Sequence, residues 1–164
     1  YDMIIMKYNI MEYQNMLFQK QIEELLNVLK QVEYNKSNFI FPDYGEKEII
    51  EAYSLDKRMK FLIDITPGKS KRRKHKMSYQ ERYTKDVVLL RLDLNGPPHT
   101  NPDGTLVSGN HLHIIKEGYD DKFAIEVPDN LIEKDNNVQT LINFLEYCKI
   151  VNPKFTNIEG RIPI

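Results

Sequence analysis

Residues 87–116 read VVLLRLDLNGPPHTNPDGTLVSGNHLHIIK, and this stretch decides the fold. Apolar and polar residues alternate toward both of its ends, which is typical of β-strands that bury one face. The segment from Asn95 to Asn110 between them is rich in proline and glycine and is longer than a simple hairpin needs. Long loops of this kind are usually functional or disordered. The stretch therefore predicts two antiparallel strands joined by a loop that belongs to a functional site.

The alternation also predicts how the two strands pair. On the first strand the even positions are apolar and belong to the core: Val88, Leu90, Leu92 and Leu94. Arg91 and Asp93 then lie on the opposite, open face, and so do His111 and His113 of the returning strand. Because register is determined where one face is buried, we expect Arg91 opposite His113 and Asp93 opposite His111.

The strand that follows is expected to extend this polar face. Residues 122–127 alternate again, with Phe123 and Ile125 on the core side. Ala124 and Glu126 then take the open side. Ala124 leaves room beside His113, and Glu126 is expected near His111.

Outward from this stretch, the chain predicts an α+β fold. Short alternating runs separated by turns indicate an antiparallel β-meander of five or six strands, and apolar residues at helical spacing indicate an N-terminal and a C-terminal helix packed on one face of it. The expected limits are a helix over 11–33, the sheet over 38–127, a helix over 136–151 and an irregular tail over 152–164, all in one domain. Residues 1–10 have no clear period and are assigned no role.

Composition places the chain among ordinary globular proteins. Its 164 residues suit one domain, and 41% hydrophobic with 29% charged residues excludes a disordered or fibrous protein. No apolar run approaches the roughly 20 residues that span a bilayer, so we expect a cytoplasmic protein without membrane contact. The single cysteine, Cys148, excludes an intrachain disulfide and is interpreted as a small buried residue.

The net charge of −1 includes one strongly basic segment. Six of the 23 basic residues stand close together: Lys69, Lys71, Arg72, Arg73, Lys74 and Lys76. This run is either a solvated loop without specific function or, with Tyr79 and Tyr83 nearby, a surface that follows a nucleic-acid backbone. With Lys116, these residues are the candidate nucleic-acid contacts.

Three interpretations of the histidines on the open face compete. The first is structural, with Asp93 and Glu126 hydrogen-bonding the rings. The second is a zinc or iron site formed by His99, His111 and His113. The third needs no metal or other cofactor: one histidine deprotonates a ribose 2′-hydroxyl, a second protonates the leaving oxygen, and Arg91 stabilises the charge on phosphorus.

Two resemblances bear on this choice. The segments RLDLNGPPHTNPDG and GNHLHIIKEGYDDKFAIEVPD resemble a family of small uncharacterised bacterial and prophage-associated proteins, over about residues 87–129. The order Arg-x-Asp, Pro-His and His-x-His, here Arg91, Asp93, His99, His111 and His113, is similar to that of TumE-type ribonuclease toxins of toxin–antitoxin modules. This resemblance implies a catalytic function for these residues and a protein antitoxin as partner.

Together these observations predict an RNA-binding protein that cleaves RNA without a metal and acts like a toxin in a mobile-element or phage-defence setting. The catalytic candidates are Arg91, Asp93, His99, His111 and His113. Two alternatives stay open. One is a non-enzymatic phage or prophage protein that inhibits a nucleoprotein defence complex, and the other is a histidine-ligated metal-binding protein.

Overall fold

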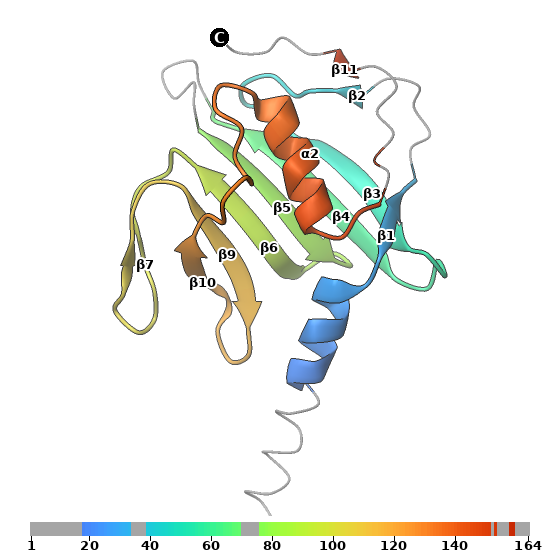
Figure 1. The fold of residues 1–164 in the computed structure, drawn as a ribbon, viewed down its shortest axis with the longest axis horizontal. Helices are drawn as coiled ribbons and strands as arrows, with labels where there is room; N and C mark the ends of the chain where they lie inside the picture. Colours follow the sequence, from blue (N-terminus) through green and yellow to red (C-terminus); the bar gives the residue numbers. More distant parts are fainter. Residues whose placement is uncertain (1–17, 34–38, 70–75, 152, 154–157, 160–164) are drawn as a thin grey trace, which may run out of the picture.

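The computed structural model describes residues 18–33, 39–69, 76–151, 153 and 158–159. Its centre is a seven-stranded sheet in the order β1-β3-β4-β5-β6-β9-β10 (Figure 1). All neighbours in it are antiparallel: β1 (Lys30–Val32), β3 (Glu48–Ser54), β4 (Lys60–Pro67), β5 (Met77–Tyr83), β6 (Val87–Leu94), β9 (His111–Lys116) and β10 (Asp120–Glu126). From β3 to β10 the order follows the chain. The predicted antiparallel meander is confirmed, and β1 is an additional strand at its edge.

The C-terminal helix, α2 (Asn137–Tyr147), was predicted from the spacing of its apolar residues. The side chain of Asn136 caps its first turn, where it accepts a hydrogen bond from the main-chain N–H of Gln139 at 2.9 Å. The helix ends earlier than position 151 because Lys149 has φ of 61°, a left-handed conformation that stops the helical hydrogen bonds.

The core lies between α2 and one face of the sheet (Figure 1). The ring of Phe144 in α2 packs in a tilted arrangement, 5.9 Å centroid to centroid, on Tyr79 of β5, whose hydroxyl donates to the main-chain oxygen of Asn137 at 2.8 Å. Leu92 and Leu112 point to the same side and are fully buried. Arg91, Asp93, His111 and His113, which alternate with these leucines, consequently lie on the opposite face, which α2 does not cover.

The N-terminal helix is shorter than predicted. Among the described residues, 18–27 are helical, and the prediction that the helix continues to position 33 is wrong because Lys30–Val32 form β1. The main chain of Lys30 bonds to Lys149 and Val151, which lie after α2. Such long-range pairing overrides the helical spacing of apolar residues. Ile22 of the helix is buried in the same core as α2.

Two small sheets lie outside the seven-stranded sheet, so the prediction that residues 38–127 form one sheet is only partly right. In the tail, β11 (Ile158–Glu159) pairs in parallel with β2 (Phe39–Ile40), so the tail is not irregular throughout. In the long loop, β7 (His99–Thr100) and β8 (Leu106–Val107) form a short hairpin. Both pairs were missed because two-residue strands have no alternation for a sequence pattern to detect.

A β-bulge in β6 changes part of the predicted core face. Glu81 pairs with Leu90 but Arg82 pairs with Val88, so Leu89 is an extra residue in β6. Paired residues point to the same side of a sheet, and Val88 therefore shares the open face with Arg82. Leu90 and the residues after it keep the predicted alternation.

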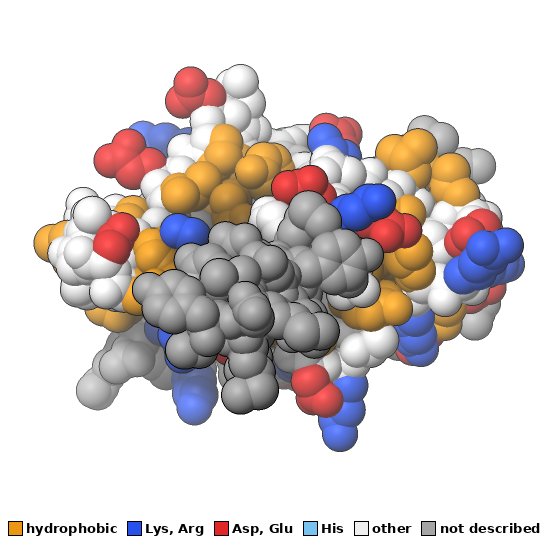
Figure 2. Space-filling view, turned by 90° about the horizontal axis from the view of Figure 1, so that it is seen from below, with side chains coloured by type: hydrophobic (Ala, Val, Ile, Leu, Met, Phe, Trp, Pro, Cys, Tyr) orange, Lys and Arg blue, Asp and Glu red, His pale blue; other side chains and the backbone are white. Residues whose placement is uncertain are grey.

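The surface seen from below in Figure 2 has acidic and basic side chains interspersed around hydrophobic patches. An anionic partner therefore meets no extended basic field among the described residues of this face. Within the described part of the chain, no helix is long and apolar enough to cross a bilayer.

Candidate functional site

The predicted polar face forms as expected. Arg91 pairs with His113 and Asp93 with His111 across β6 and β9. On the other side of β9, Ala124 pairs with His113 and Glu126 with His111. Both register predictions are confirmed, and the polar side chains lie on the face away from α2.

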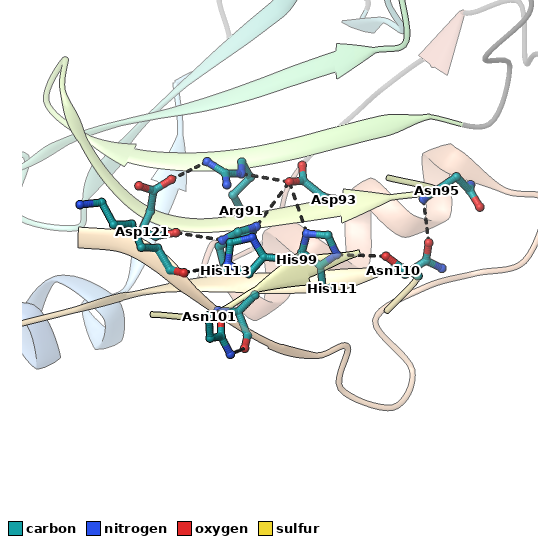
Figure 3. Close-up of polar contacts among 12 residues, drawn as sticks. Arg91, Asp93, Asn95, His99, Asn101, Asn110, His111, His113 and Asp121 are labelled. Carbon is teal, nitrogen blue, oxygen red and sulfur yellow. Dashed lines mark hydrogen bonds and ion pairs between the residues drawn. The ribbon is translucent and has the colours of Figure 1, made fainter. Parts of the chain in front are cut away.

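The hairpin of β7 and β8 brings the third histidine to this face. The main-chain N–H of Asn95 donates to the side-chain oxygen of Asn110 at 2.8 Å, which closes the base of the loop. A Cβ atom on Gly96 would lie only 3.9 Å from Cε1 of His111, so the loop backbone packs closely on that ring. From there the chain folds His99 back over His111 and His113 (Figure 3).

Asn101 attaches the hairpin to the edge of the sheet. Its side-chain oxygen accepts from the N–H of Ala124 at 2.8 Å, and its side-chain nitrogen donates to the oxygen of Ala124 at 2.9 Å. The amide thus pairs with β10 as a neighbouring strand would. Sequence reasoning missed Asn101, because an asparagine before proline in an Asn-Pro-Asp-Gly turn usually serves its own turn.

The three histidine rings form one compact cluster (Figure 3). Their centroids are separated by 4.5 Å for His99 and His113, 4.9 Å for His111 and His113, and 5.6 Å for His99 and His111. One nitrogen from each ring lies within 4.8 Å of the other two, so the three rings could hold a metal ion. His111 and His113 are only 3% and 2% exposed, whereas His99 is partly exposed.

Each ring is oriented by a main-chain carbonyl oxygen. His99 Nε2 lies 2.8 Å from the oxygen of Lys122, His111 Nδ1 lies 3.0 Å from that of Gly109, and His113 Nδ1 lies 2.8 Å from that of Asp121. A carbonyl oxygen only accepts hydrogen bonds, so these three nitrogens carry protons. In neutral rings the other nitrogens, Nδ1 of His99 and Nε2 of His111 and His113, have free lone pairs.

Asp93 and Arg91 border the cluster. The Asp93 carboxylate lies 3.6 Å from His113 Nε2 and 3.8 Å from His111 Nε2. Arg91 donates through Nε to Asp93 at 3.1 Å and forms a second ion pair with Asp121 (Figure 3). Two carboxylates therefore neutralise Arg91, which makes it less available to a phosphate group than the sequence suggests.

Comparison with known proteins places this site within a family. Residues 17–150 match the profile of the family of unknown function DUF6978. The chain belongs to this family. No curated protein and no solved structure matches it. The matched region contains the whole histidine cluster and the hairpin that completes it.

The expected nucleic-acid contacts are only partly described. Lys71, Arg72, Arg73 and Lys74 lie outside the described residues of this family member, whereas Lys69 and Lys76 at the two ends of the basic run are described. The two chain segments that carry them are paired, since the main-chain N–H of Gly68 donates to the main-chain oxygen of Lys76 at 2.7 Å. Lys116 is not part of the same face. Its Nζ lies 3.9 Å from the ring centroid of Phe123, on the side of the sheet that faces α2.

Burial and the nearby charge of Arg91 lower the pKa of His113 from its ordinary value of 6.5 to about 4. Folded protein then binds fewer protons than unfolded protein between pH 4 and 6.5, so its stability rises with pH through this window and is complete above it. We expect the free energy of unfolding in EDTA to fall by up to about 3 kcal/mol on acidification from pH 6.5 to 4. Urea titrations at several pH values measure it. His113→Asn keeps a donor for the main-chain oxygen of Asp121 and should flatten the pH dependence of the free energy of unfolding. An equally steep pH dependence in this variant would show that His113 is not its cause.

Proposed function

We propose that this protein cleaves RNA at the cluster of His99, His111 and His113. The observation that supports the proposal most is the position of Lys69 and Lys76, the two described ends of the basic run. Pro67 pairs with Met77 and Met77 with Leu94, so Lys69 and Lys76 extend from the end of the sheet at which Asp93 and His111 lie. Strands are spaced about 4.8 Å apart, and two spacings, roughly 10 Å, separate β5 from β9. An RNA backbone on the lysines can therefore reach the histidines.

Cleavage of RNA needs a base, an acid and a positive charge near phosphorus, and the cluster offers the base and the acid. The ribose 2′-oxygen loses its proton to a base and attacks phosphorus, the bond from phosphorus to the 5′-oxygen breaks, and that oxygen takes up a proton. In the route without a metal, histidines of the cluster act as base and acid. The ion pairs of Arg91 with two carboxylates leave the negative charge on phosphorus to be stabilised by another cation.

The setting that we propose follows from the resemblance to TumE-type toxins. The protein would act in a mobile-element or phage-defence context, with a protein antitoxin that blocks the open face of the sheet. A non-enzymatic inhibitor of a nucleoprotein complex is the alternative, and it would use the same lysines without any need for the histidines.

Purified protein is expected to cleave single-stranded RNA, and to bind it more weakly as salt increases. Lys69→Gln together with Lys76→Gln should reduce the slope of log affinity against log salt by about 1.4, because each phosphate contact to a single strand contributes about 0.7. Fluorescence anisotropy measures the affinity for RNA at salt concentrations from about 50 to 300 mM, a range over which salt screening of charges changes. The slope is obtained from these affinities.

The matched control removes the same charge elsewhere. Lys20 and Lys134 are exposed and distant from the open face in sequence, so Lys20→Gln with Lys134→Gln should leave the slope unchanged. Absence of cleavage with any single-stranded RNA would refute the enzyme proposal. Equal slopes for both double variants would refute the function of the basic run.

A further inference from the structure

We propose that His99, His111 and His113 bind one divalent transition-metal ion, zinc or iron, through Nδ1 of His99 and Nε2 of His111 and His113. This site does not depend on RNA cleavage and can be tested without RNA. It adds a route to cleavage with a metal ion beside the one in which the histidines act as free acids and bases.

The hydrogen bonds of the three rings support this assignment. Metal-binding histidines commonly donate their other N–H to a carbonyl or carboxylate, which fixes the tautomer and orients the ring. Here all three rings donate to main-chain carbonyl oxygens, of Lys122, Gly109 and Asp121. The unprotonated nitrogen of each ring is therefore left to bind a cation, and the ring centroids lie only 4.5 to 5.6 Å apart, an arrangement that suits a shared cation.

The charge around the cluster also suits a cation. Lone pairs of His111 and His113 face the Asp93 carboxylate at 3.8 and 3.6 Å, which is repulsive unless a positive charge lies among them. Arg91 beside a metal ion would normally be unfavourable. Its ion pairs with Asp93 and Asp121 more than offset its charge, since two carboxylates and one guanidinium sum to −1.

The distances require only a small closure. With zinc–nitrogen bonds of about 2.05 Å, tetrahedral ligand nitrogens lie about 3.4 Å apart, whereas one nitrogen from each of the three rings lies within 4.8 Å of the other two. His111 and His113 are fixed on β9. His99 is on the two-residue strand β7, so the hairpin can supply the required movement of about 1 Å while Asn101 retains its bonds to Ala124.

The ligand set indicates which ion binds and what the ion can do. Imidazole suits zinc, iron, copper or nickel, whereas magnesium and calcium prefer oxygen ligands. Three protein ligands leave at least one position for water or a phosphate oxygen, as in catalytic zinc sites. An ion here would supply the positive charge that Arg91, neutralised by two carboxylates, does not offer to a phosphate.

Metal titration of the full-length, metal-free protein tests the site. Isothermal calorimetry with Zn²⁺ is expected to show one equivalent bound, and Co²⁺ should produce the visible absorbance of a tetrahedral nitrogen site. His99→Ala should weaken Zn²⁺ binding at least 100-fold. His99 is partly exposed, so this variant is expected to fold, which circular dichroism verifies. The matched control is His75→Ala, which removes the remaining histidine of the chain and should leave the affinity unchanged.

Asn101→Ala tests whether the hairpin must hold His99 in place for the metal ion to bind. It removes no ligand but releases the hairpin from β10, and loss of such a supporting contact typically costs 10- to 100-fold in metal affinity. No Zn²⁺ binding by the wild type, or equal affinity in wild type and His99→Ala, would overturn the site. Cleavage of RNA in EDTA would overturn the use of the metal in catalysis but leave the proposed function intact. Metal binding without any cleavage would overturn the proposed function but leave the metal site intact.

Discussion

Replacing Lys30 with alanine should lower the free energy of unfolding by about 3–5 kcal/mol, the cost of removing one partner of a buried ion pair. Lys30 and Glu81 are both fully buried, with 3.0 Å between Nζ and Oε1. Lys30 also donates to the main-chain oxygen of Cys148 at 2.8 Å and lies 4.7 Å from the ring centroid of Phe61. Neither Glu81 oxygen has a well-formed hydrogen bond in the described structure, so the ammonium group is the main compensation for this buried carboxylate.

The pH dependence of the Lys30→Ala variant provides a second measurement. Burial raises the pKa of Glu81 although Lys30 opposes the shift, and without Lys30 the shift becomes larger. Folding of the variant then takes up a proton, so its stability decreases as pH rises above the value of 4.5 for an unfolded glutamate. Urea unfolding should show a larger deficit relative to wild type at pH 8 than at pH 5.

Glu81→Leu combined with Lys30→Met is the control for this prediction. Replacing both charges with apolar side chains of similar size is often neutral, so the double variant should be more stable than Lys30→Ala. Additive losses from the two sites would mean that the charges do not compensate each other, which would contradict the prediction.

The same lysine illustrates which parts of the fold the sequence could predict. The strands of the meander were predictable because alternation along 87–94 and 111–116 is a local signal of one buried face. β1 was not predictable in this way. Lys30 occupies a polar position in a helical pattern, and the strand there is stabilised by contacts with residues far away along the chain: pairing with β3, main-chain bonds to Lys149 and Val151, and the ion pair with Glu81.

The candidate site was predictable for a related reason. Burial of one face limits the register of β6 and β9 to pairs whose positions sum to an even number, and the pairing of Arg91 with His113 is one of these. The bulge at Leu89 leaves this pairing in place because the extra residue precedes the site. The contacts of Asn101 and Asp121 were not predictable. Asp121 belongs to β10, which begins before the predicted strand at 122–127, and it lies within a register shift between Asp120 and Phe123. Alternation contains no information about where such irregularities occur.

The largest functional effect is expected from His111→Ala. Its Nε2 faces Asp93 while the backbone of Gly96 covers its ring, so the substitution removes a base or a metal ligand at the centre of the site. RNA cleavage should decrease by about 100- to 10,000-fold, the usual effect of losing an acid–base group. Initial rates on labelled single-stranded RNA measure it, with Lys20→Gln, at an exposed position of the N-terminal helix, as the control that should retain wild-type activity. In bacterial cells, induced wild-type protein should stop growth and His111→Ala should not. A cleavage rate in His111→Ala within about threefold of wild type, in protein whose circular dichroism shows a native fold, would place the chemistry elsewhere, because both routes to cleavage, with and without a metal, need this ring.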